Sequence, residues 1–171
     1  MKNRKRGFSL VELLIVLAVI AALIATITPV ALNAIKKAKA TQVAQNLKTL
    51  ASAIENKGYV EGATGIADLT KLTDVARDIS SQYEAYVIPD GSGEYTIWIV
   101  YNGTDVDVSE VSKILQDVEE AYGNVLYTVT ADDEDNEAFK LTSDTAEDLK
   151  ENDEIKPDNG AAYYTFDFTI Y

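Results

Sequence analysis

Residues 8–35 have the sequence Phe8-Ser-Leu-Val-Glu12-Leu-Leu-Ile-Val-Leu-Ala-Val-Ile-Ala-Ala-Leu-Ile-Ala-Thr-Ile-Thr-Pro29-Val-Ala-Leu-Asn-Ala-Ile35. From Leu13 to Leu32, only Thr26, Thr28 and Pro29 interrupt the run of apolar side chains. A helix needs roughly 20 such residues to cross the apolar core of a bilayer, and this run has that length. We therefore expect residues 8–35 to form a membrane-spanning helix.

Three other interpretations of this segment fit less well. A cleavable signal peptide has an apolar core of about 7–15 residues; Ala38-Lys39-Ala40 would serve as its cleavage site, but the core here is longer and contains Glu12. A plain signal-anchor helix leaves Glu12 unexplained. A buried helix of a soluble domain fits least, because Val11–Ala25 is apolar all round apart from Glu12.

Glu12 is the only charged residue between Phe8 and Ile35. A carboxylate at mid-bilayer costs roughly 2.5–3.5 kcal/mol on translocon scales and less near the interface, so Glu12 needs a partner. Lys5 and Arg6 are the nearest cations in the chain. Cleavage between Gly7 and Phe8 would create another, an α-ammonium that neutralises the carboxylate of a neighbouring subunit in an apolar bundle.

The segment Lys5-Arg6-Gly7-Phe8-Ser9-Leu10-Val11-Glu12-Leu13 resembles the class III signal of type IV prepilins and pseudopilins. The resemblance implies that residues 1–7 are a leader peptide, which prepilin peptidase removes by cleaving after Gly7. It also implies that Phe8 becomes N-methylated and that Glu12 sets the register between subunits.

Two further positions relate to this family. Pro29 lies where the family places a proline that disturbs the helix, whereas Ala21 stands where many members have Gly. The resemblance extends over residues 1–35, so it says little about the rest of the chain directly.

Composition excludes several classes of function. The 171 residues include no Cys and no His, which removes disulfides, thiol chemistry, Cys-ligated zinc and the usual general base. Residues 1–40 carry a formal charge of +6 and the rest −19, for a total of −13. The acidic part argues against direct binding of nucleic acid and favours a topology with the N-terminus inside. No carboxylate pair is singled out by a nucleophile or an apolar pocket, so we expect no enzymatic activity.

Residues 36–57 are expected to continue the helix with one apolar face. That face is formed at steps of three and four residues by Ala40, Val43, Leu47, Leu50 and Ile54. Gly58, after Lys57 in the last turn, is expected to end the helix.

Residues 58–171 are expected to form an acidic globular head. We expect helical turns at Ile66–Leu72 and Asp74–Ile79. We expect strands at Tyr83–Pro89, Glu94–Tyr101, Asn124–Thr130 and Tyr164–Ile170. One helix is expected from Asp107 to about Tyr122, beginning with an Asp107/Glu110 capping box. The expected fold class is α+β, a long N-terminal helix packed on an antiparallel sheet of about four strands. The pilin fold implied by the resemblance has the same layout.

Two features of the head have both a functional and a structural interpretation. Asp133, Asp135 and Glu137 have the 1-3-5 spacing of a calcium loop, but Ala138 and Asp144 replace the Gly and Glu of its sixth and twelfth positions. A solvated acidic loop is therefore the preferred interpretation, and no cofactor is expected.

Most of the ten Tyr residues lie in predicted strands. We expect their rings to pack in the core and across strands; a sugar- or protein-binding surface is the alternative.

The resemblance implies a structural subunit of a type IV pilus. Its precursor would cross the bacterial cytoplasmic membrane once, and the pilus assembly machinery would polymerise the mature chain into a helical homopolymer at the cell surface. Adhesion, twitching motility or surface attachment would follow. A pseudopilin of a type II secretion system and a minor or competence pilin are the alternatives within the family. Outside it, the alternative is a membrane-anchored binding protein that does not polymerise.

Overall fold

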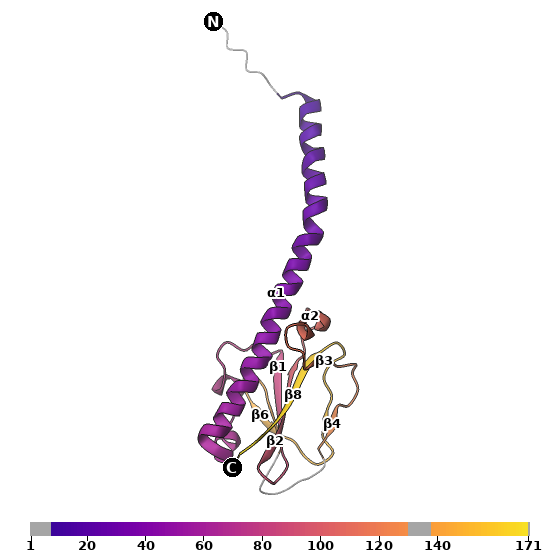
Figure 1. Cartoon of the computed structure of the whole chain (residues 1–171). Helices are drawn as coiled ribbons and strands as arrows, with labels where there is room; N and C mark the ends of the chain where they lie inside the picture. Colours follow the sequence, from indigo (N-terminus) through magenta and orange to yellow (C-terminus); the bar gives the residue numbers. More distant parts are fainter. Residues whose placement is uncertain (1–7, 130–137, 171) are drawn as a thin grey trace. The chain divides into compact units, whose positions relative to one another are not determined.

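The computed structural model describes residues 8–129 and 138–170 (Figure 1). Residues 1–7, the expected leader peptide with Gly7, lie outside the described residues, as do the calcium candidates Asp133, Asp135 and Glu137. The chain divides into two compact units, residues 1–38 and residues 39–171. The boundary falls within the first helix, α1 (Leu10–Ala67), so the first unit contains the early turns of α1 and the second unit is the head.

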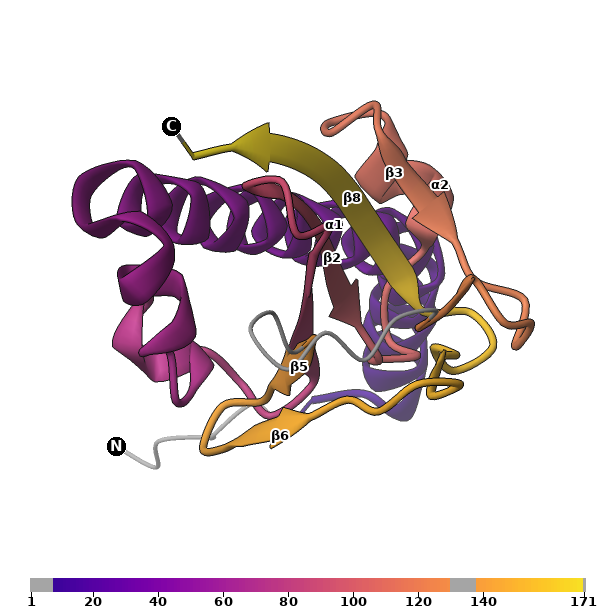
Figure 2. The ribbon, with the colours of Figure 1, turned by 90° about the horizontal axis from the view of Figure 1, so that it is seen from below.

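The head half of α1 packs on the sheet through the predicted apolar stripe. Ala40, Leu47, Leu50 and Ile54 are fully buried, and Val43 is 3% exposed. These side chains share one hydrophobic core with the inner face of the sheet, and Figure 2 shows α1 running along that side. The predicted stripe is confirmed.

Gly58 does not end the helix, so this prediction was wrong. The long helix runs past Gly58 and breaks at Gly62, where φ is 72° and ψ is −164°; the range Leu10–Ala67 joins two helices across this kink. Gly58 is buried instead, and a Cβ atom there would lie 2.6 Å from Cε2 of Phe168. The glycine therefore permits close packing against the last strand. The helical turns expected at residues 66–79 reduce to the end of α1 and one 3-10 turn, Leu72–Asp74.

Two predicted strands have the bounds that the sequence indicated. They are β1 (Tyr83–Pro89) and β2 (Glu94–Tyr101), which form an antiparallel hairpin with Tyr83 opposite Tyr101. The hairpin turn is held by Asp90, whose carboxylate accepts hydrogen bonds from the backbone nitrogens of Ser92 and Glu94 at 2.9 and 3.1 Å. This Asx-type bonding is why the Pro-Asp-Gly-Ser-Gly sequence forms a turn.

The last strand, β8 (Ala162–Thr169), pairs antiparallel with β2 along its whole length. Its side chains alternate as predicted: Tyr164 and Phe168 are buried in the core shared with α1, whereas Thr165 and Asp167 are exposed. The strand thus closes the sheet against the helix without a disulfide.

The sheet has six strands, in the order β3-β8-β2-β1-β5-β6, rather than about four. The additional strands are short and lie at its two edges: β3 (Val118–Glu120), β5 (Phe139–Leu141) and β6 (Ala146–Asp148). A separate pair of two-residue strands is formed by β4 (Tyr127–Thr128) and β7 (Glu154–Ile155). Three-residue strands carry almost no alternation, which is why the sequence did not predict them.

The helix expected from Asp107 to Tyr122 is much shorter, because its second part forms a strand. Helix α2 spans only Val108–Ser112, with the Asp107 carboxylate accepting from the backbone nitrogen of Ser109. Glu110 pairs with Lys113 instead of completing the capping box. Val118 is buried opposite Tyr164, so pairing with the edge of β8 replaces the last helical turns. The strand expected at residues 124–130 is limited to β4.

Candidate functional site

The first turn of α1 is fixed by a hydrogen-bonded cap. Phe8 and Ser9 precede the helix, which begins at Leu10. Ser9 Oγ accepts from the backbone nitrogen of Val11 at 3.3 Å, and Glu12 Oε2 accepts from the backbone nitrogen of Ser9 at 2.9 Å. The Glu12 bond is that of a Ser-x-x-Glu capping box, while the Ser9 side chain caps the amide of Val11, one residue earlier than in the standard box. This cap was not predicted, although its signal is present in the sequence: Ser9 and Glu12 stand three residues apart before an apolar run.

The cap places the Glu12 carboxylate at the positive end of the helix dipole, where a negative charge is stabilised. Phe8 is not helical, and its side chain is 82% exposed. Phe8, the first described residue, is therefore accessible just before the helix begins.

The first unit presents apolar side chains on every face. Between Leu10 and Ile35 the large apolar side chains are 46% to 79% exposed. One window of α1 has a mean hydropathy of 2.9 with none of it buried, so the helix is long and apolar enough to cross a membrane by length and composition. A helix that is apolar all round requires lipid or other apolar helices around it.

Pro29 lies inside α1, and the described helix continues through it. Proline has no backbone N–H, so the carbonyl of Ala25 lacks its usual donor. Thr26 and Thr28 lie next to this position, and both hydroxyls bond to earlier carbonyls: Thr26 Oγ1 donates to Leu23 O at 2.9 Å, and Thr28 Oγ1 donates to Ile24 O at 2.7 Å. The two hydroxyls thus add hydrogen bonds to the turn preceding Pro29. Their own O–H groups also have acceptors, although the segment is otherwise apolar.

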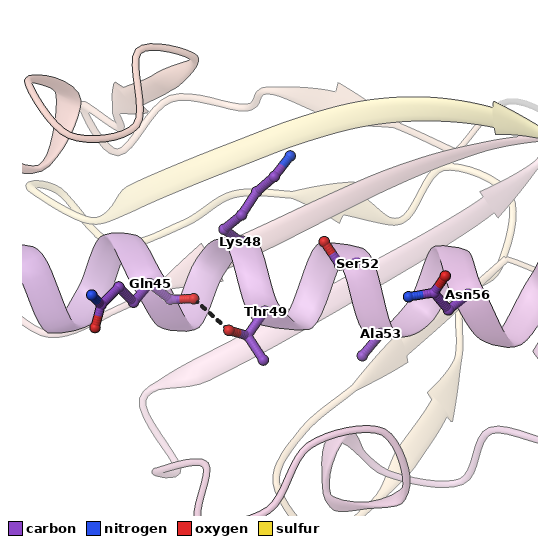
Figure 3. A pocket seen from close by; sticks show the side chains of 6 residues that line it. All are labelled: Gln45, Lys48, Thr49, Ser52, Ala53 and Asn56. Atoms are coloured by element: carbon purple, nitrogen blue, oxygen red, sulfur yellow. Dashed lines mark hydrogen bonds between the residues drawn. The ribbon is translucent and has the colours of Figure 1, made fainter.

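The head half of α1 has an open face opposite the buried stripe. An open groove of about 630 Å³ follows this face (Figure 3), lined by Gln45, Lys48, Thr49, Ser52, Ala53 and Asn56. Thr49 Oγ1 folds back onto Gln45 O at 2.7 Å, and Lys48 Nζ lies 5.5 Å from the ring centre of Tyr164. The short side chains of Thr49, Ser52 and Ala53 permit another helix to approach this part of the face closely.

Within residues 8–129 and 138–170, no group of three or more Asp or Glu side chains is placed to hold a metal ion.

The perturbed pKa values in the head belong mainly to tyrosines. Burial raises the pKa of Tyr83 to about 12, and burial together with the Glu119 carboxylate raises that of Tyr163 to about 12. Hydrogen bonds from Thr70 and Ser92 lower the pKa values of Asp74 and Asp90. These shifts follow from packing and turn formation.

The Tyr residues of the strands are packed, as predicted. Six of them are at most 8% exposed, namely Tyr83, Tyr86, Tyr95, Tyr101, Tyr163 and Tyr164. Trp98 lies in a second apolar cluster on the outer face of the sheet, where its ring is 5.6 Å from that of Tyr163 and 6.4 Å from that of Tyr127.

Residues 2–28 match the family model of the prokaryotic N-terminal methylation motif. This motif is the type IV prepilin-like signal, so the resemblance predicted from Gly7-Phe8-Ser-Leu-Val-Glu12 is confirmed. It supports a type IV pilin-like or pseudopilin protein. The motif and the apolar helix that follows it are consistent with membrane anchoring of a precursor. No curated protein and no solved structure matches the chain.

Proposed function

We propose that this chain is the structural subunit of a type IV pilus filament. The observation that carries the proposal is the joining of a prepilin-like signal to a helix whose apolar side chains are exposed on every face from Leu10 to Ile35. Such a helix is stable in a bilayer before assembly and in a bundle of identical helices afterwards. The subunit would pass from the cytoplasmic membrane, N-terminus inside, to the cell surface.

Processing would begin with cleavage between Gly7 and Phe8 by prepilin peptidase, followed by N-methylation of Phe8. The new α-ammonium would pair with the Glu12 carboxylate of a neighbouring subunit and thereby set the register. A carboxylate has about four lone-pair sites, so Glu12 can keep its bond to Ser9 and still accept this cation. The capping box and the pairing between subunits are therefore compatible.

The head half of α1 supports the same assembly. One face is buried against its own sheet, while the open groove face, with Thr49, Ser52 and Ala53, remains available to a neighbouring helix. The partners of the chain would be further copies of itself, the peptidase, the assembly machinery and the membrane. Adhesion, motility or attachment would be roles of the filament; the subunit would have no catalytic activity and no direct contact with nucleic acid.

The test is mass spectrometry of N-terminal peptides from the sheared cell-surface fraction and, separately, from membranes. A peptide that begins at methylated Phe8 in the sheared fraction would support both processing and surface assembly. The same peptide confined to membranes would favour a pseudopilin or a minor pilin. An intact leader, residues 1–7, in both fractions would contradict processing and favour a membrane-anchored protein that does not polymerise.

The absence of natural Cys allows a second test of the filament. A cysteine introduced for Ser52, on the open groove face, should form intermolecular cross-links in sheared filaments. A cysteine at Asp117, exposed on the loop before β3, is the matched control at a position away from α1. Equal cross-linking at the two positions would contradict packing through this face.

A further inference from the structure

A small polar pocket of about 180 Å³ lies within the head, beside α1, the loop before β1 and the far end of β2. Its α1 wall is formed by Lys39, Gln42, Val43 and Asn46, which share one helix face because they are spaced three or four residues apart. A cavity of about 150 Å³ holds one benzene ring. This pocket therefore has room for one small ring or the end of one side chain.

The wall opposite α1 contains two buried aromatic rings. Tyr83 and Tyr101 are 3% and 4% exposed, and their ring centres are 4.8 Å apart. Asn46 Nδ2 donates to the Tyr83 hydroxyl at 3.0 Å, and the Tyr101 hydroxyl donates to Asp105 Oδ1 at 2.7 Å. These bonds fix both rings, so this wall is preformed.

The ring of Tyr101 is also held by backbone on its other side. Gly103 is buried there, and a Cβ atom at this position would lie 2.3 Å from Tyr101 Cζ. A larger residue would displace the ring, so Gly103 contributes to the shape of the pocket.

The pocket has one unpaired charge. Lys39 and Asp105 form an ion pair with each other, and Asp105 uses its second oxygen on Tyr101. Asp78 is exposed at the rim of the pocket, and within the described part of the chain it forms no ion pair. The net charge of the lining is therefore −1, which disfavours phosphates and carboxylates.

We propose that this pocket binds an organic cation of side-chain size, an ammonium or guanidinium group on a short alkyl stem. The Asp78 carboxylate and the side-chain oxygens of Gln42 and Asn46 accept the hydrogen bonds of the cationic group. Val43, Tyr83 and Tyr101 also line the pocket; they are only 3% to 4% exposed, so they offer the short alkyl stem a small apolar contact. Residues 39–171 carry a formal charge of −18, which raises the local concentration of cations at this surface.

The experiment uses the full chain in detergent micelles and follows the side-chain amide NMR signals of Gln42 and Asn46. The probe is n-butylammonium chloride; n-butanol, glucose and sodium chloride are titrated in parallel at matched concentration. Saturable shifts with butylammonium alone are expected. Equal shifts with sodium chloride or butanol would overturn the proposal, and saturation by glucose instead would make the pocket a site for neutral polyols.

The decisive variant is Asp78→Asn, which removes the unpaired charge. Asp78 has a φ of 59°, a left-handed conformation that Asn also adopts readily, so the loop should keep its shape. Butylammonium binding should weaken by up to about fivefold, the range expected for an exposed pair of charges. The control Asp117→Asn changes the charge equally at a residue that is exposed, like Asp78, but does not line the pocket. Equal affinities of the Asp78→Asn variant and the wild type would overturn the proposal.

A peptide with a single Lys, titrated in the same way, distinguishes the two sources of this chemistry. Tighter binding of the peptide than of butylammonium would identify a protein side chain as the ligand, and the reverse would identify a free amine. The measurement requires no filament, so its result does not depend on the proposed function.

Discussion

Glu12 Oε2 accepts a hydrogen bond from the backbone nitrogen of Ser9 at 2.9 Å, and Ser9 Oγ accepts one from that of Val11 at 3.3 Å. An α-helix leaves its first amide groups without intrahelical partners, and in an apolar environment each unpaired amide costs free energy. Both residues follow the proposed cleavage site, so the cap stays with the mature chain. Glu12 therefore caps its own helix, independently of the proposed pairing between subunits.

Ser9→Ala should loosen the first turn of α1 without preventing leader processing. Loss of an N-cap hydroxyl typically costs about 1 kcal/mol, so the amides of the first turn should exchange about fivefold faster in micelles. Hydrogen exchange followed by NMR measures this. Ser9→Thr is the control, because Thr also caps helices. Unchanged exchange in Ser9→Ala would show that the cap contributes nothing to helix initiation.

Glu12→Ala and Glu12→Gln separate the cap from the charge. Glutamine also completes a capping box, but it cannot neutralise an ammonium. We expect both variants to be cleaved after Gly7 and neither to give filaments in the sheared fraction, as measured by N-terminal mass spectrometry and filament yield. Normal filaments from Glu12→Gln would assign the role of Glu12 to the cap, and normal filaments from both would remove the register argument.

The sequence predicted those parts of the fold that have either a long repeating pattern of apolar residues or a strand pattern together with a turn sequence. The strands of the β1–β2 hairpin were predicted with their bounds because two β-rich runs flank the turn sequence Pro-Asp-Gly-Ser-Gly, and the α1 stripe repeats over four turns. Gly58 was misread because a glycine that ends a helix and one that admits a neighbouring ring look alike in sequence. Only the position of Phe168, 110 residues later, distinguishes them.

The helix predicted from Asp107 to Tyr122 failed for a related reason. Val111, Ile114, Leu115 and Val118 have helical spacing, but the open edge of β8 competes for Val118. Of the candidate site, the sequence supplied Gly7, Phe8 and Glu12 through their motif. It could not supply the pocket around Asp78, because that pocket combines residues from α1, a loop and two strand ends.

Gly58→Ala should destabilise the head although alanine is the better helix former. The helix-propensity gain is about 1 kcal/mol, but the new Cβ would lie 2.6 Å from Phe168 Cε2 and 3.2 Å from Ile170 Cδ1. Overpacking of this kind costs about 1–3 kcal/mol. Urea unfolding followed by near-ultraviolet circular dichroism measures the change.

The double variant Gly58→Ala/Phe168→Leu is the control for this contact. If the ring is the cause, the two changes should be less damaging together than the sum of the single effects, because they share one contact. A more stable Gly58→Ala single variant would show that α1 can move away from β8, contrary to the close packing described.

The buried tyrosines should make the head less stable at high pH. Burial raises the pKa of Tyr83 to about 12, while an unfolded tyrosine titrates near 10. Below pH 10 both states are protonated and the contribution is fully present. Between about pH 10 and 12 the unfolded state loses its proton first, so the free energy of unfolding falls. Tyr83→Phe should reduce this slope, and Tyr122→Phe, at a side chain that is 73% exposed, should not. Equal slopes would contradict the role of burial.

Added salt or divalent cations should stabilise the filament. Removal of residues 1–7 would take away four basic residues and leave a formal side-chain charge of −17 per subunit. In a filament, heads of this charge lie near one another, and their repulsion is screened over about 10 Å at 0.1 M salt and over about 3 Å at 1 M. The recovered yield of sheared filaments should therefore rise with sodium chloride, and at equal ionic strength it should rise further with a divalent salt if cations bridge the heads. A gain with sodium chloride alone would assign the effect to screening. A yield indifferent to both salts would mean that the acidic heads do not limit assembly.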